Sequence, residues 1–115
     1  MTKKFKVETF TKKDSGALKD EAGKPMVDLV TPEMITAIAE VLTYGSKKYE
    51  PRNWEKGIPY MANYAAAMRH LLQWHAGVDI DEESGLRHID QAVTNLAMIA
   101  TQTRRERSDL DDRPK

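Results

Sequence analysis

The sequence contains no cysteine, which excludes disulfide bonds and thiolate metal sites. It has no excess charge either, because 18 lysine and arginine residues balance 18 aspartate and glutamate residues. A chain without net charge gives no indication of non-specific nucleic-acid binding, so we expect no binding of nucleic-acid polymers. No apolar run approaches the length of a membrane span or of a signal-peptide core. We therefore expect a cytoplasmic protein without a membrane partner.

The length of 115 residues predicts one domain with a modest hydrophobic core. Residues 1–15 are polar and basic and are interpreted as a flexible or short-strand segment, because apolar residues alternate in "KFKVETF". The following "KKDSGALKDEAGKP" is typical of a loop. Residues 16–105 form the expected helical domain, and residues 106–115 form a charged tail that we expect to fray.

Hydrophobic periodicity predicts three helices. The first begins after Thr31 at Pro32 and ends at Gly45, the second runs over residues 60–76, and the third runs over residues 86–105. Two apolar stripes predict the core faces of the second and third helices: Tyr64, Met68, Leu71, Leu72 and His75 on one, and Leu86, Ile89, Val93, Leu96 and Ala100 on the other. The fold class is therefore all-α, a small bundle of three main helices with a short extended N-terminal segment. Because three helices bury little surface, we expect homo-oligomerisation to complete it.

The acidic loop, residues 78–85, joins the second and third helices and carries Asp79, Asp81, Glu82 and Glu83. Hard cations such as Mg²⁺ prefer carboxylate oxygens. In an extended loop Asp79, Asp81 and Glu83 would point the same way and could share a metal ion. The alternative is a solvated loop whose acids favour the positive end of the third helix.

Histidines lie on both sides of this loop. His70 is on the second helix, and His88 is two turns before Asn95 on the third. Two packed helices would bring these three side chains near the acids. Histidine is a common metal ligand and moves protons near neutral pH. The alternative is a hydrogen-bonded role at the edge of the core.

The basic-aromatic loop, residues 46–59, combines cations, aromatic rings and an amide. The cations of Lys48 and Arg52 could hold phosphates, Tyr49 or Trp54 could stack on a base, and Asn53 could bind a base edge. The alternative is a surface loop anchored by Trp54. Taken together, the acids, histidines and this loop predict a site for a metal-bound nucleotide.

The order of these residues resembles the phage and bacterial family of dATP/dGTP diphosphohydrolase N-terminal domains. The matching pieces are "GKPMVDLVTPE", "VLTYGSKKYEPRNWEKGIPY", "AAMRHLLQWHAGVDIDEESGLRH" and "AVTNLAMI", and they extend over most of residues 16–105. This family in turn resembles the all-α, MazG-like nucleotide pyrophosphohydrolases. That resemblance implies an all-α dimer or tetramer that uses Mg²⁺, or Mn²⁺, to hydrolyse a nucleoside triphosphate to the monophosphate and pyrophosphate.

The resemblance and the residue chemistry together assign three groups of candidate side chains. The catalytic candidates are His70, His88 and Glu83. The metal ligands are Asp79, Asp81 and Glu83. The nucleotide-binding candidates are Lys48, Tyr49, Arg52, Asn53, Trp54, Arg69 and Asn95. The expected substrate is a purine deoxynucleoside triphosphate, and the expected purpose is to shape the nucleotide pool of a phage or bacterium.

Two departures from the pattern that the resemblance implies bear on the metal site, besides Met26, which stands where an arginine is expected. Val78 stands where a glutamate is expected, and Gln91 stands where a second histidine is expected. These departures favour an alternative function, a protein that binds and sequesters a nucleotide or a nucleotide-derived signal, such as one made by a host defence system, without turnover. A helical protein-interaction module is a third reading, but it leaves the candidate site without a purpose.

Overall fold

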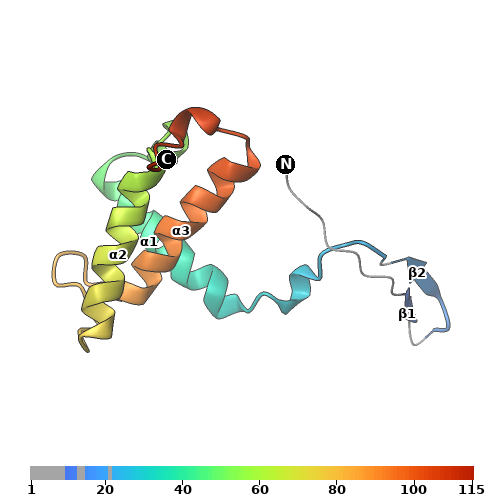
Figure 1. The fold of residues 1–115 in the computed structure, drawn as a ribbon. Helices are drawn as coiled ribbons and strands as arrows, with labels where there is room; N and C mark the ends of the chain where they lie inside the picture. The colour runs from blue at the N-terminus through green and yellow to red at the C-terminus, as the bar shows by residue number, and fades with distance from the viewer. Residues whose placement is uncertain (1–9, 13–14, 21) are drawn as a thin grey trace. The chain divides into compact units, whose positions relative to one another are not determined.

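The computed structural model describes residues 10–12, 15–20 and 22–115. The chain divides into two compact units, Met1–Thr31 and Pro32–Lys115. The second unit contains three helices, so the predicted all-α bundle is confirmed (Figure 1). No helix in the described part of the chain combines the length and the apolar character that crossing a membrane requires.

The first unit contains a small antiparallel ribbon. Strand β1 (Phe10–Lys12) pairs with β2 (Leu18–Asp20), with Phe10 opposite Asp20. The short 3-10 helix η1 (Val27–Leu29) follows. Residues 18–20 were expected to form a loop, and this prediction was wrong because pairing with β1 supplies the backbone hydrogen bonds that the sequence pattern does not reveal. Residues 4–9 of the expected strand lie outside the described residues.

Helix α1 (Pro32–Lys48) begins at the predicted proline. Glu33 lies in its first turn and Lys47 and Lys48 in its last, so each charge complements the helix dipole. The predicted end at Gly45 was wrong, because the helix continues for one more turn. A glycine inside a helix costs only about 1 kcal/mol, whereas Pro51 restricts the backbone just before it, and the helix ends ahead of it.

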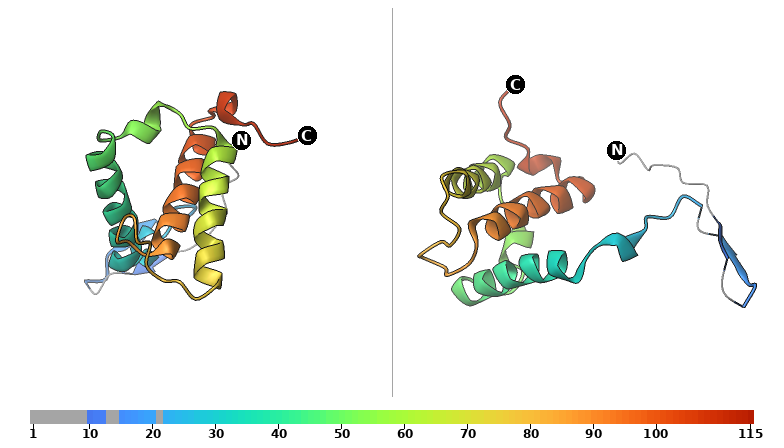
Figure 2. Two further views of the ribbon diagram at one scale, coloured as in Figure 1. Left: turned by 90° about the vertical axis from the view of Figure 1, so that its left-hand side faces the viewer. Right: turned by 90° about the horizontal axis from the view of Figure 1, so that it is seen from below.

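Helices α2 (Tyr60–His75) and α3 (His88–Arg104) run in opposite directions and pack closely. Both views of Figure 2 show α3 between α1 and α2, and α3 contacts both of them. Ala67 and Ala92 are each 1% exposed, and their small side chains let the two helices approach one another. The acidic loop is hydrogen-bonded to the start of α3, since the His88 N–H donates to the Asp79 carbonyl at 2.8 Å. This loop delays the start of α3 to His88 instead of residue 86.

The predicted core faces of α2 and α3 were wrong. Their apolar stripes are largely open to solvent, with exposed fractions from 37% to 62% for Tyr64, Met68, Leu72, Ile89, Val93 and Leu96, a set that we call the apolar face. The buried side chains of α2 and α3 are instead mostly polar: Asn63, His88, Gln91, Thr94 and Gln102. Periodicity identifies an apolar stripe but not the surface that covers it, which explains the error.

The C-terminal tail does not fray as expected. Residues Ser108–Leu110 form the 3-10 helix η3, and Leu110 is buried. The Asp112 carboxylate accepts a hydrogen bond from the Met61 N–H at 2.9 Å, and the Tyr60 hydroxyl donates to the Arg107 carbonyl at 3.3 Å. The tail therefore covers the start of α2 and satisfies a backbone N–H that the helix leaves without an internal partner.

Candidate functional site

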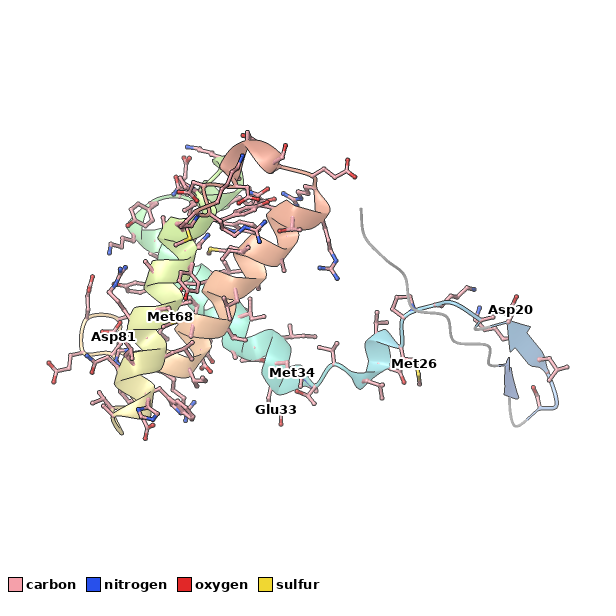
Figure 3. All side chains as sticks on the ribbon, viewed as in Figure 1. Asp20, Met26, Glu33, Met34, Met68 and Asp81 are labelled. Carbon is pink, nitrogen blue, oxygen red and sulfur yellow. The ribbon has the colours of Figure 1, made fainter. Side chains whose placement is uncertain are left out.

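Two histidines face one another between α2 and α3. The Nδ1 atoms of His70 and His88 are 2.9 Å apart, and the ring centroids are separated by 5.1 Å. Asp81 in the acidic loop approaches the same point, and one ligand atom from each of the three residues lies within 4.8 Å of the others. Figure 3 shows Asp81 on the loop beside α2. We call this group the histidine–aspartate cluster.

The carboxylate of Asp81 is held by three donors. Its Oδ1 accepts the Glu83 N–H at 3.0 Å, and its Oδ2 accepts the Ser84 hydroxyl at 3.3 Å and the Gln91 amide at 3.0 Å. Burial opposes the ionised form, but the hydrogen bonds from Gln91, the Glu83 backbone and Ser84 outweigh it and lower the pKa of Asp81. Asp81 is therefore an oriented anion at neutral pH.

The imidazole of His70 is half-buried. Burial lowers the pKa of His70, the neighbouring His88 acts in the same direction, and the charge of Asp81 opposes them. His70 is consequently neutral at neutral pH, with one ring nitrogen free to accept a proton or a cation. When no cation is bound, the short Nδ1–Nδ1 distance requires one ring to donate and the other to accept.

A second polar pair lies further along the same helix contact. The Asn95 amide donates to the Asn63 amide oxygen at 3.1 Å. Asn63 precedes His70 by seven residues on α2, and Asn95 follows His88 by seven on the antiparallel α3. Seven residues of helix correspond to about 10 Å. We call the row formed by Asn63, His70, His88, Gln91 and Asn95 the polar seam.

The seam opens into a pocket of about 520 Å³ at its Asn63–Asn95 end. Helix α1 and the basic-aromatic loop form the other walls of this pocket. Four of the predicted nucleotide-binding residues of that loop and of α3 line it: Tyr49, Asn53, Trp54 and Asn95. Arg52 also lines the pocket, although its side chain is 82% exposed and its guanidinium pairs with Glu55 at 3.0 Å. The loop folds locally as the 3-10 helix η2 (Asn53–Lys56).

One ion pair connects α1 to the acidic loop. The Lys48 ammonium lies 3.3 Å from a carboxylate oxygen of Glu83 and 5.6 Å from the centroid of the Tyr49 ring. Both charged side chains are substantially exposed, so the pair adds little stability. Lys48 does not line the pocket, but the pair places its cation next to the loop that holds Asp81.

The three acids expected to share a metal ion do not converge. Residues 82–84 form a turn instead of an extended strand, so the alternation of Asp79, Asp81 and Glu83 no longer aims them together. Among the described residues, the cluster that could hold a metal contains Asp81 with the two histidines and neither of the other two acids. Asp79 contributes its carbonyl to the start of α3, and Glu83 pairs with Lys48. Arg69 is exposed and lines neither the pocket nor the cluster.

Three side chains that shape the site were not predicted from the sequence. Gln91 was treated as a departure from a pattern, yet it binds Asp81. Asn63 was not a candidate, although its spacing from His70 mirrors that of Asn95 from His88 and could have revealed it. The Glu55 carboxylate accepts hydrogen bonds from Arg52 and Arg105 and so joins the pocket wall to the end of α3, a contact that no local pattern predicts.

The fold and the site define a helical protein in which two antiparallel helices bury a row of polar side chains beside a pocket. The family model described as dATP/dGTP diphosphohydrolase, N-terminal, matches residues 14–113, and the chain belongs to this family. The resemblance found in the sequence is thereby confirmed.

A curated relative supports the same assignment. The protein named dATP/dGTP diphosphohydrolase from Salmonella phage PMBT28 is 33% identical over 82 residues, which cover 71% of this chain. The matched region is 28% of the relative's length, so the chain corresponds to a minor part of that protein. No solved structure matches the chain significantly.

Proposed function

We propose that this chain hydrolyses a purine deoxynucleoside triphosphate to the monophosphate and pyrophosphate with the help of a divalent cation. The family description and the name of the phage relative support the reaction class. The observation that carries the proposal is the continuity between a pocket with aromatic and amide walls and a histidine–aspartate cluster two helical turns away. Such an arrangement suits a ligand with a base at one end and phosphates at the other.

The pocket would hold the nucleoside part. Trp54 and Tyr49 offer ring faces to a base, and the side-chain amide of Asn53 can both donate to and accept from a base edge. The side-chain amides of Asn63 and Asn95 line the pocket where it meets the polar seam, and a single hydrogen bond joins them. Their other amide donors and acceptors are therefore left for the ligand. The base and sugar would thus be bound by groups that are already in place.

The phosphates would extend along the seam toward the acidic loop. Arg52 lines the pocket and Lys48 pairs with the acidic loop, and both are exposed enough to exchange their carboxylate partners for phosphate oxygens. A divalent cation bound at Asp81 would neutralise the triphosphate and polarise the phosphorus to be attacked. Glu83, freed from Lys48, is a carboxylate that could accept a proton from the attacking water.

Product analysis tests the proposal. The purified protein is incubated with each deoxynucleoside and ribonucleoside triphosphate, with Mg²⁺, with Mn²⁺ and with EDTA, and the products are separated by ion exchange. We expect monophosphate and pyrophosphate from dATP or dGTP only when metal is present. Asp81→Asn should lower turnover at least 100-fold while circular dichroism stays unchanged, and Glu82→Gln, which changes an exposed acid of the same loop, should not.

A non-catalytic nucleotide-binding function is the second candidate. One observation favours it: the Gln91 amide and the Ser84 hydroxyl both donate to Oδ2 of Asp81, which reduces the capacity of that oxygen to bind a cation. The same incubation separates the two functions. Intact nucleotide recovered from a complex that forms equally well in EDTA would support sequestration and contradict hydrolysis.

A further inference from the structure

The donor atoms of the histidine–aspartate cluster are two imidazole nitrogens and one carboxylate oxygen. We propose that His70, Asp81 and His88 bind a first-row transition-metal ion, such as Co²⁺, Ni²⁺ or Zn²⁺, in preference to Mg²⁺. This proposal deepens the proposed function, because it identifies the cation of the same site. It can nevertheless be tested without nucleotide and without turnover.

The spacing of the nitrogens fits a shared ion. Metal–nitrogen bonds to histidine are about 2.1 Å long, and two such ligands at a right angle are separated by about 3.0 Å. The observed Nδ1–Nδ1 distance is 2.9 Å. One shared proton would also explain this approach, and the metal titration described below distinguishes the two.

The donor types determine which ion is selected. Mg²⁺ prefers oxygen ligands in near-ideal octahedral geometry, whereas imidazole suits zinc, copper, iron and nickel. Two nitrogens among three protein ligands therefore favour the transition metals. Three protein ligands also leave coordination positions open for water or a phosphate oxygen, as catalytic metal sites require.

The surroundings hold the ligands in place. The Asp81 carboxylate is oriented by Gln91, Ser84 and the Glu83 N–H, and His88 is buried between the helices. Such outer partners typically change metal affinity by about 10–100-fold when they are removed. By contrast, Glu83 is 72% exposed and already paired with Lys48. A metal site formed by carboxylates alone would therefore have a ligand that is less firmly held in position.

The test is a metal titration of the full chain after treatment with EDTA and dialysis. Isothermal titration calorimetry with Co²⁺, Ni²⁺, Zn²⁺ and Mg²⁺ should show one transition-metal ion per chain, bound at least ten-fold more tightly than Mg²⁺. His70→Ala should weaken Co²⁺ binding at least ten-fold. His75→Ala is the matched control, because it removes an exposed imidazole from the same helix, and it should bind Co²⁺ like the unaltered protein.

Variants of the acidic loop separate this site from an all-carboxylate site. Asp81→Asn should lose Co²⁺ binding, while Asp79→Asn and Glu83→Gln should keep it. Equal affinity for Mg²⁺ and Co²⁺, unchanged binding by His70→Ala, or loss of binding in Glu83→Gln would each overturn the proposal. A positive titration without hydrolysis would retain the metal site and refute only the proposed reaction.

A spectroscopic readout covers the case in which His70→Ala does not fold. Zn²⁺ added to the unaltered chain should shift the ring proton resonances of His70 and His88 in the NMR spectrum and leave those of His75 unchanged. Ring resonances that respond equally for all three histidines, or not at all, would contradict the site.

Discussion

His70 on α2 and His88 on α3 meet with their Nδ1 atoms 2.9 Å apart, in the same antiparallel register that pairs Asn63 with Asn95. The two contacts are separated by two turns on each helix. One helix pairing therefore sets the geometry of both the histidine–aspartate cluster and the inner end of the pocket. A change in that pairing would alter both regions together.

The amide pair Asn63–Asn95 should be energetically coupled. Asn63→Ala or Asn95→Ala leaves the other side chain without its partner, and each change should cost about 1–3 kcal/mol of unfolding free energy. Changing both should cost less than the sum of the single changes, because no unpaired amide remains. Urea denaturation of the four proteins measures the coupling. Strictly additive costs would show that the hydrogen bond does not contribute to stability.

Trp54 should bind the base. Because stacking of an aromatic side chain on a base is worth roughly 1–3 kcal/mol, Trp54→Ala should weaken nucleotide binding by roughly ten-fold or more. The second tryptophan provides the control, since Trp74 is 48% exposed on α2 and does not line the pocket. Equilibrium dialysis with dATP and dGTP compares the two variants. Equal affinities would mean that Trp54 only anchors its loop.

Gln91 should act on the proposed metal site through Asp81. Gln91→Leu removes a donor to Oδ2, and the carboxylate should lose both its orientation and part of its stabilised charge. We expect Co²⁺ affinity to fall by about 10–100-fold, which is typical when an outer partner of a ligand is lost. Calorimetry measures the change, with Gln73→Leu on the exposed surface of α2 as the control. Tighter Co²⁺ binding would instead show that the Gln91 amide competes with the cation.

The pH dependence of stability should include a contribution from His70. Its pKa is lowered in the folded protein, chiefly by burial, so the folded state binds fewer protons than the unfolded state, where the pKa is about 6.5. This contribution is complete above about pH 6.5 and is lost as the pH falls through the lowered folded-state pKa. Urea midpoints of the metal-free protein at several values between pH 5 and pH 8 should therefore decrease on the acid side.

The variant His70→Gln tests whether His70 is the source of the loss of stability at acid pH. It should show a flatter acid dependence than the unaltered chain, whereas His75→Gln should reproduce the dependence of the unaltered chain. Identical profiles for the unaltered protein and His70→Gln would remove His70 as the source.

The apolar face should mediate the expected homo-oligomerisation. On each helix its stripe is offset by roughly a quarter to a third of a turn, in the same rotational sense, from the face that packs on the other helix. Because α2 and α3 are antiparallel, both stripes come to one side of the pair. We expect sedimentation to show a dimer or larger assembly, and Leu72→Glu should shift it toward the monomer. Leu18→Glu, at an exposed leucine of β2, is the control. A monomeric unaltered chain would contradict the expectation.

The helix positions could be predicted from the sequence because they depend on local signals. Pro32 begins α1, and Gly77 directly follows the Ala76 cap of α2, so the predicted and observed bounds differ by three residues or fewer. The buried faces could not be predicted in this way. An apolar stripe on a helix indicates that something covers it, but the sequence does not distinguish the chain's own core from a partner.

The candidate site was predicted in part for a similar reason. His70, His88 and the acidic loop were expected to meet, because packed helices bring their ends to a shared loop, and these elements do lie together. The sequence did not show which of the acids would lie beside the histidines, because that depends on the turn at residues 82–84. The contribution of Gln91 was hidden as well, because the bond to Asp81 joins residues that only the folded loop brings together.

The separation of the polar seam from the apolar face has a consequence for how such a protein can diverge. On α2, Asn63 and His70 belong to the polar seam, for which we propose the ligand role, while Tyr64, Met68 and Leu72 are exposed on the apolar face. The two sets occupy different faces of α2. Ligand preference and assembly can therefore drift independently within a single helix, so two members of the family could share a quaternary structure while binding different nucleotides, or the reverse.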